Sequence, residues 1–302
     1  MLNYWQVINK LIISFYRKVS VRVSLVDMKS LLLKAEEGNF GVGAFSVGNM
    51  EMIMGAVKAA EESKSPAILQ IAQVRLSYSP LPLIGPMMIA AAKNASVPIA
   101  VHFDHGTDIA AIKEALELGF TSVMIDASHL PIKENIKIVK EVKNMADNYG
   151  ASVEAEVGQL GKSEDGTKDT GMFYSNPAEV KDLYESTMVD AIALSIGNAH
   201  GLYKDEPKLN FNILSETRKL VSVPLVLHGG SGISEEDFRK CIEYGIRKVN
   251  IATASFMAVE EGARRYSVGE KRDYFKLSSE MATGMYNNVK EHINIFKSNG
   301  KA

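Results

Sequence analysis

Eight short apolar runs recur along the chain, and this regular recurrence constrains the fold more than any other feature. The runs cover residues 40–47, 67–71, 98–103, 122–125, 152–157, 191–196, 224–227 and 248–251. Most of them are continuous rather than alternating, which is typical of parallel strands that are buried on both faces. The runs therefore predict eight such strands.

Amphipathic stretches lie between the runs and predict helices, because their apolar residues recur every three or four positions. The clearest stretches are residues 50–63, 108–118, 132–149 and 235–244. Capping residues are predicted at helix starts and glycines at helix ends. They are Asn176 and Ser234 at the starts, and Gly119, Gly150 and Gly245 at the ends. Strand–helix units with short connections indicate an α/β fold, a single-domain (β/α)8 TIM barrel, with a doubly wound open sheet as the alternative.

Composition limits the classes of function. The 302 residues carry a formal net charge of −2, which argues against a nucleic-acid partner because such surfaces usually need a basic stripe. No apolar run reaches the ~18–20 residues that a bilayer-spanning helix needs, so no membrane partner is expected. Cys241 is the only cysteine, so no internal disulfide can form, which fits a reducing cytoplasm. We expect a cytoplasmic protein whose catalytic barrel covers residues 23–302.

Residues 1–22 are predicted to form an N-terminal extension of that barrel. The first 20 residues contain Lys10, Arg17 and Lys18 and no acid. They are not typical of a signal peptide, because Lys10 interrupts the apolar stretch and no small-residue cleavage site follows. We interpret the segment as an extra helix or as an extension from an upstream start. An interfacial anchor is the alternative.

Polar residues follow most of the predicted strands at the point where each strand ends. In a (β/α)8 barrel the active site lies at these carboxyl ends. The polar residues are Asp104 and His105, Asp126, Glu154 and Glu156, His200, His228, and Asn250 with Thr253. Ionisable groups are costly inside an apolar barrel, so we expect these residues to share one rim.

Three histidines of this set, His105, His200 and His228, suggest a metal site. Three neutral imidazoles suit Zn²⁺ and leave coordination positions open for a substrate. For any one of them alone, a hydrogen-bonded histidine of the barrel is the simpler interpretation. His102 shares the strand face of Asp104 and is a candidate for an outer position. The remaining two histidines, at positions 129 and 292, are assigned no role.

Glycine-rich segments follow the last two predicted strands, at residues 229–232 and 250–253. Barrels commonly bind phosphate at this place through backbone N–H groups, and Gly201 could add another. Flexible turns are the simpler alternative. A P-loop at residues 156–163 is rejected because the first glycine of that motif is missing.

The segment at residues 158–169 is polar and glycine-rich, and it follows the fifth predicted strand. It carries Glu164 and Asp165. A mobile acidic loop beside an active site can deliver a proton-transfer group, although a solvated loop would have the same composition.

Six motifs taken together carry a family resemblance. They are FDHG at residues 103–106, SVMIDASH at 122–129, VEAEVG at 153–158, GNAHG at 197–201, LVLHGGSG at 225–232 and KVNIAT at 248–253. With these motifs the chain resembles the class II fructose-bisphosphate and tagatose-bisphosphate aldolases from about residue 26 to residue 297. Gly106 is more typical of fructose-type members.

The resemblance implies a role for each matching residue. By resemblance, His105, His200 and His228 hold the catalytic zinc, and Asp104 is the general acid/base at the ketose 4-hydroxyl. Glu164 falls where the loop acid of the family exchanges the carbon proton. The positions that can touch a second or displaced metal are Asp126 and Glu156. The cradle for dihydroxyacetone phosphate is matched by Gly201, Gly229, Ser231, Asn250 and Thr253.

The resemblance also implies features outside the metal site. Backbone carbonyls near Gly201 and Gly229 match a site for a monovalent cation, Na⁺ or K⁺. Arg272 stands where family members place an arginine that reaches the distal phosphate in a neighbouring subunit, so a homodimer or homotetramer is expected. Ser46 replaces a common asparagine, and Ala72 replaces a serine that many members use for the distal phosphate. Both departures concern the aldehyde half of the substrate.

The expected reaction is the reversible zinc-dependent cleavage of a phosphorylated ketose, foremost fructose 1,6-bisphosphate. The products would be dihydroxyacetone phosphate and an aldehyde such as glyceraldehyde 3-phosphate. Zn²⁺ can stabilise the charge left on the ketone side when the C–C bond breaks, while Asp104 takes the hydroxyl proton. A Schiff-base lysine, Lys204 or Lys248, would be another way to stabilise that charge, but three histidines make it unnecessary.

Other functions remain open on the sequence alone. An aldolase for tagatose bisphosphate or for a ketose 1-phosphate would have the same motifs. A metal-dependent sugar-phosphate epimerase or isomerase would share the zinc and phosphate sites. A non-catalytic sugar-phosphate-binding barrel is disfavoured by Asp104 beside His105, because binding alone does not need a carboxylate next to a metal.

Overall fold

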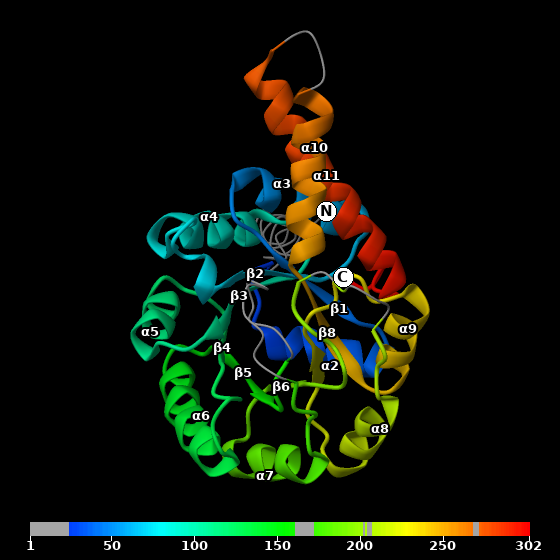
Figure 1. The fold of residues 1–302 in the computed structure, drawn as a ribbon. Coiled ribbons are helices and arrows are strands. Elements are labelled where there is room, and N and C mark those ends of the chain that lie inside the picture. Colours follow the sequence, from blue (N-terminus) through cyan, green and yellow to red (C-terminus); the bar gives the residue numbers. More distant parts are fainter. Residues whose placement is uncertain (1–23, 161–171, 202, 204–206, 268–271) are drawn as a thin grey trace, which may run out of the picture.

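The computed structural model describes residues 24–160, 172–201, 203, 207–267 and 272–302. Eight parallel strands close into a barrel in sequence order, with the last strand paired to the first (Figure 1). The strands are β1 (Val42–Ser46), β2 (Ala67–Ala72), β3 (Ile99–Gly106), β4 (Ser122–Ile125), β5 (Ser152–Val157), β6 (Ala191–Leu194), β7 (Leu225–Leu227) and β8 (Ile246–Ile251). The predicted (β/α)8 barrel is confirmed, and the alternative of an open sheet is wrong.

Helices precede and follow the strands along the chain, and most of them surround the barrel (Figure 1). They are α2 (Met28–Gly38), α3 (Met50–Glu62), the 3-10 turn η1 (Gln73–Arg75), α4 (Leu81–Asn94), α5 (Ile109–Glu117), α6 (Ile132–Asp147), α7 (Pro177–Thr187), α8 (Phe211–Leu220), α9 (Glu235–Glu243), α10 (Thr253–Ser267) and α11 (Tyr274–Ile295). All strand residues are buried, as expected for parallel strands covered on both faces.

The predicted helix boundaries are confirmed at both kinds of end. The side chain of Asn176 accepts a hydrogen bond from Ala178 N at 3.0 Å, and Ser234 Oγ accepts one from Asp237 N at 3.2 Å. These bonds satisfy backbone donors of the first turn of α7 and α9. The three predicted terminal glycines, Gly119, Gly150 and Gly245, all have positive φ.

The two ends of the barrel interior differ in polarity. At the amino end, α2 packs Leu31 and Leu32 against small apolar interior residues such as Ala44 and Ala100. At the carboxyl end the interior is polar yet buried. It holds Gln70, His102, Asp104, His105, Glu154, Glu156, His228, Lys248 and Asn250. The single polar rim that the sequence predicts is therefore present.

The last two helices form a hairpin that projects beyond the barrel (Figure 1). Glycines let α10 and α11 approach closely: a Cβ at Gly284 would lie 2.1 Å from the carbonyl oxygen of Ala258, and one at Gly262 would lie 2.4 Å from that of Glu280. Helix α11 also packs on α3. The hairpin is not among the helices that the apolar spacing predicts.

The predicted N-terminal extension, residues 1–22, lies outside the described residues, so the division at residue 23 remains a prediction. Within the described part of the chain, every helix is too short or too polar to cross a bilayer.

Candidate active site

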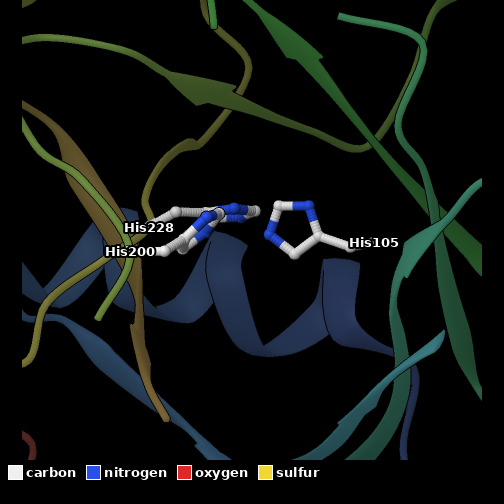
Figure 2. Close-up of side chains that lie close together, drawn as sticks. All are labelled: His105, His200 and His228. Carbon is white, nitrogen blue, oxygen red and sulfur yellow. The ribbon is translucent and has the colours of Figure 1, made fainter. Parts of the chain in front are cut away.

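Three buried imidazoles converge at the carboxyl end of the barrel (Figure 2). The ring centroids of His105 and His228 are 4.5 Å apart, those of His105 and His200 are 4.8 Å apart, and those of His200 and His228 are 6.1 Å apart. One ring nitrogen from each residue lies within 4.8 Å of the others, a spacing from which one ion could be held. The predicted convergence of these histidines is therefore present.

An irregularity in β3 aims His105 at the other two rings. The pairing of β3 with β4 shifts register between Phe103 and Gly106, and His105 has φ of 44°. A left-handed conformation costs a non-glycine residue roughly 1–2 kcal/mol, so the surrounding fold must hold this backbone in place. Gly106 cannot easily be replaced, because a Cβ there would lie 2.6 Å from the carbonyl oxygen of Met124.

Carboxylates fix the orientation of two of the rings. His105 Nδ1 lies 2.9 Å from Asp126 Oδ2, and His228 Nε2 lies 2.7 Å from Glu154 Oε1. Burial alone would raise the pKa of Asp126, but hydrogen bonds from His105 and Ser128 lower it below its usual value. Burial lowers the pKa of His228, which favours a neutral imidazole. A neutral ring backed by a carboxylate is the usual state of a metal-binding histidine.

Asp104 is fully buried and fixed by two amides. Gln70 Nε2 donates to its Oδ2 at 3.1 Å, and Asn250 Nδ2 donates to its Oδ1 at 3.1 Å. Burial would raise the pKa of Asp104, but His105, His102 and Lys248 together lower it well below its usual value. The carboxylate is therefore ionised and oriented, as a proton acceptor must be.

Lys248 joins the two carboxylate systems inside the barrel. Its ammonium group lies 2.8 Å from Glu154 Oε2 and donates to Asn250 Oδ1 at 2.7 Å. Burial would raise the pKa of Glu154, but Lys248 and His228 lower it to about 2. Sequence reasoning considered this lysine only for a Schiff base. In the structure it is engaged in a buried ion pair instead.

Among the described residues, two further groups of three histidine, aspartate or glutamate side chains lie close enough together to hold a metal ion. Asp126 and Glu156 approach His105 closely enough to share an ion, as the resemblance implies for a second metal. Burial and the charge of Asp126 raise the pKa of Glu156 well above its usual value. The other group is His102, Asp104 and Glu154, where the Lys248 ammonium already supplies the positive charge.

The five residues of the predicted phosphate cradle line one small cavity beside His200. They are Gly201, Gly229, Ser231, Asn250 and Thr253. Gly229 has φ of 63°, and a Cβ there would lie 2.2 Å from the carbonyl oxygen of Ala199, so only glycine fits. Ser231 Oγ accepts from Ala254 N at 2.9 Å and so fixes the first turn of α10.

Tyr203 is a site residue that sequence reasoning missed. Its hydroxyl accepts a hydrogen bond from Ala199 N at 2.8 Å and donates one to Gly229 O at 2.9 Å. Burial raises the pKa of Tyr203 to about 12. The phenol ties the loop after β6 to the loop after β7, and these two loops supply the cradle glycines. No motif marks such a residue, because its role depends on the approach of two loops.

Other predicted residues lie elsewhere. Glu164 and Lys204 fall outside the described residues. Arg272 is exposed and lies between α10 and α11, just before the first turn of α11. His292 donates from Nδ1 to Asn288 O at 2.8 Å within α11 and packs against Phe238.

Known proteins are similar to this chain in sequence and in fold. The family model for fructose-bisphosphate aldolase class II matches residues 26–301. The fructose-bisphosphate aldolase of Staphylococcus epidermidis is 38% identical over 83% of this chain and 88% of its own length. That of Geobacillus stearothermophilus is 40% identical over 80% and 85%. The crystal structure of the YdjI aldolase of Escherichia coli K12 superposes with a TM-score of 0.83 at 33% identity, covering 92% of this chain and 99% of that one. The chain thus belongs to the class II fructose-bisphosphate aldolase family, a family of lyases.

Proposed function

We propose that the chain is a ketose-bisphosphate aldolase that reversibly cleaves a ketose 1,6-bisphosphate, foremost fructose 1,6-bisphosphate, to dihydroxyacetone phosphate and glyceraldehyde 3-phosphate. The observation that carries the proposal is Asp104, a buried and ionised carboxylate next in sequence to one of three convergent histidines. An aldolase for tagatose bisphosphate or for a ketose 1-phosphate is the alternative within the same chemistry.

His105, His200 and His228 would hold the metal. The class II family is zinc-dependent in general, and the donor set fits zinc, because three imidazoles leave coordination positions for a substrate. The contacts of His228 support zinc binding at this site. Its Nε2 is hydrogen-bonded to Glu154, and its Nδ1 has no hydrogen-bond partner, so Nδ1 is the nitrogen that could bind a metal. Bound zinc supplies Lewis-acid stabilisation of the negative charge that develops on the ketone side during cleavage.

Asp104 carries the proton transfer. Its carboxylate takes the proton from the hydroxyl at the cleaved carbon, the C–C bond breaks, and the aldehyde forms on that side. The electron pair stays with the ketone half, which becomes dihydroxyacetone phosphate when its carbon is protonated. Gln70 and Asn250 hold Asp104 in place through their amides, which keeps the proton acceptor in one orientation.

The cradle binds the phosphate of the dihydroxyacetone half. Gly201 and Gly229 present bare backbone, Ser231 and Thr253 present hydroxyls, and Asn250 links the cradle to Asp104. A ketose whose phosphate is bound there would have the bond to be broken near the histidines and Asp104. Backbone carbonyls near Gly201 and Gly229 are the proposed site of a monovalent cation.

The remaining assignments concern residues beyond this centre. Glu164 is proposed to exchange the carbon proton of dihydroxyacetone phosphate, so Glu164→Ala should slow that exchange with solvent. Asp126 and Glu156 are proposed to hold a second or displaced metal. Arg272 is proposed to serve the site of a neighbouring subunit, which requires a homodimer or homotetramer. A cytoplasmic location is proposed with the same function.

A retro-aldol screen tests the proposed function. The purified protein is incubated with the bisphosphates of fructose, tagatose and sorbose and with ketose 1-phosphates, and release of dihydroxyacetone phosphate is followed with a coupled dehydrogenase. We expect release from fructose 1,6-bisphosphate at a rate that falls severely in Asp104→Ala. An epimerase or isomerase would instead convert the sugar without producing dihydroxyacetone phosphate, and a binding protein would leave every substrate intact.

A further inference from the structure

His200 is the candidate metal ligand that lies farthest in sequence from its strand. His105 belongs to β3 and His228 directly follows β7, whereas His200 lies well into the loop after β6. Strands β6 and β7 are paired in register as far as Leu194 and Leu227, so their ladder ends before His200 is reached. Loops are held less firmly than strands. The position of His200 therefore depends on contacts that its loop makes with other parts of the site.

The hydroxyl of Tyr203 connects the loop of His200 to the loop of His228. It accepts a hydrogen bond from Ala199 N at 2.8 Å and donates one to Gly229 O at 2.9 Å. Ala199 directly precedes His200, and Gly229 directly follows His228. One hydroxyl therefore bridges two backbone groups, each of which is adjacent in sequence to a candidate metal ligand.

Asn198 forms a second bridge between the same loops. Its Nδ2 donates to the backbone oxygen of His228 at 2.9 Å, and its Oδ1 accepts from Ile196 N at 2.8 Å. The two bridges thus bind consecutive carbonyls, those of His228 and Gly229. Asn198 is fully buried, whereas Tyr203 is half-buried. The hydroxyl of Tyr203 is therefore the bridge that can be removed with the smaller disturbance of the interior.

The contacts of Tyr203 also fix part of the phosphate cradle. Gly229 O accepts from Tyr203, and Gly230 N donates to Asn250 O at 3.1 Å, so the peptide group between the two glycines is bound at both ends. The Tyr203 ring lies against the same segment, because a Cβ at Gly232 would be 3.1 Å from Tyr203 Cδ2. Gly229 and Asn250 both line the cradle cavity. Tyr203 thus contacts the glycine-rich segment at both of its ends.

The separation of the two loops matters because one substrate molecule must contact both. In the proposed reaction the ketose binds with its phosphate in the cradle and its reacting carbons near the histidines. The distance between these two parts of the molecule is set by its covalent bonds. A displacement of about 1 Å can lower a rate by about 10²-fold in such a site. A bridge that maintains the separation therefore serves both contacts.

We propose that Tyr203 is a positioning residue whose hydroxyl holds the loop of His200 against the loop of His228, and that this one bridge sets both the spacing of the metal ligands and the shape of the phosphate cradle. The role rests on the proposed aldolase function, which assigns the two loops to a metal and a phosphate. Because backbone groups engage the hydroxyl on both sides, Tyr203 acts through the loops and not on the substrate. Its removal should change binding of zinc and of dihydroxyacetone phosphate more than proton transfer at Asp104.

Tyr203→Phe tests the assignment at the histidines, because it keeps the ring against Gly232 and removes only the hydroxyl. Zinc affinity is measured by competition with a fluorescent chelator. We expect it to fall about tenfold, which is the lower end of the effect of losing a group that orients metal ligands. The visible absorption spectrum of the Co²⁺-loaded protein should also change, because it depends on the arrangement of the ligands.

The same variant tests the assignment at the cradle. Calorimetry on the zinc-loaded protein gives the dissociation constant of dihydroxyacetone phosphate, which should rise about tenfold in Tyr203→Phe. In the condensation direction, the KM for dihydroxyacetone phosphate should rise by a similar factor, while kcat should fall less than about threefold. The smaller effect on kcat is expected because the hydrogen bonds that Asp104 accepts from Gln70 and Asn250 are intact.

Tyr184→Phe is the matched control. Tyr184 is a half-buried tyrosine on the outer helix α7, and its hydroxyl lies 3.5 Å from Ser222 Oγ. This variant should have the zinc affinity, cobalt spectrum and dihydroxyacetone phosphate affinity of wild type. Melting temperatures of both variants establish that each is folded.

Two results would overturn the role of Tyr203. If Tyr203→Phe melts at a lower temperature but keeps the zinc affinity, the cobalt spectrum and both dihydroxyacetone phosphate constants of wild type, the hydroxyl only stabilises the fold. If only zinc binding or only dihydroxyacetone phosphate binding changes, one bridge does not serve both sites.

The proposed function can fail separately from this role. If wild type binds zinc and dihydroxyacetone phosphate but cleaves no ketose, the proposed function is wrong. The binding constants, which need no turnover, then still decide whether Tyr203 positions the two loops. If wild type binds neither zinc nor dihydroxyacetone phosphate, the proposed function and the role of Tyr203 both fail.

Discussion

Glu154 and His228 are joined inside the barrel by a 2.7 Å contact between Oε1 and Nε2, and both side chains are buried. The pKa of Glu154 is lowered to about 2, so the carboxylate is ionised and can only accept. The ring proton of His228 therefore lies on Nε2, and the lone pair lies on Nδ1. Since the second hydrogen bond of a histidine sets its tautomer, this contact selects the nitrogen that can bind a metal.

Glu154→Gln should weaken zinc binding. The glutamine keeps the size of the side chain but removes the charge that orients and polarises the imidazole of His228. We expect zinc affinity to fall roughly 10–100-fold, the usual effect of losing such a partner. Competition with a fluorescent chelator measures it, and Glu141→Gln, at an exposed position on α6, is the control. Equal affinities in the two variants would contradict the role of Glu154.

Lys248 and Glu154 should be energetically coupled. Each single variant, Lys248→Met or Glu154→Gln, leaves one buried charge without its partner and should destabilise the fold by about 3–5 kcal/mol. The double variant removes both charges, so its destabilisation should be clearly smaller than the sum of the single effects. Urea unfolding followed by circular dichroism gives the three free energies. Additive values would mean that the 2.8 Å contact carries no net interaction.

Asp104→Asn should separate catalysis from metal binding. The amide has the shape of the carboxylate but cannot take a proton, so we expect kcat to fall roughly 10²–10⁴-fold. The zinc content should stay at the wild-type level, because the three histidines are intact. Metal analysis and the coupled assay are run on the same preparation. A variant that lost zinc together with activity would assign Asp104 to metal binding instead.

Cys241 should be unreactive toward thiol reagents in the folded protein. It is fully buried on α9, and burial raises the pKa of its thiol to about 12. Since only the thiolate reacts, thiol reagents should not label the native protein at pH 8, and labelling should begin only when the chain unfolds. A folded-state pKa above the unfolded value also means that stability declines as pH rises above about 9. Rapid labelling in the absence of denaturant would show that α9 opens readily.

The sequence predicted the barrel because parallel strands buried on both faces leave continuous apolar runs. Residues 122–125 and 152–157 coincide with β4 and β5. Some of the helices were harder to predict from the spacing of apolar residues. Helix α4 contains Pro86 and is apolar around most of its circumference, so its sequence does not show an apolar face that alternates with a polar one. The α10–α11 hairpin depends on close packing at Gly262 and Gly284, and such packing leaves no periodic signal.

At the site, the residue types were predictable and the contacts were not. His105, His200 and His228 follow strands whose carboxyl ends must meet in a closed barrel. The Lys248–Glu154 pair joins β8 to β5, which are not neighbours in the sheet, so it arises only when the interior is filled. The positive φ of His105 follows from a register shift that no sequence pattern specified.

Cleavage should depend on one zinc held by the three histidines, and a metal titration is the direct test of this dependence. The protein is stripped with a chelator, the removal is verified by elemental analysis, and activity on fructose 1,6-bisphosphate is measured as Zn²⁺ is returned. We expect no activity in the stripped protein and a linear recovery that ends at about one zinc per chain. Full activity after verified metal removal, or trapping of the substrate on a lysine by borohydride, would contradict it.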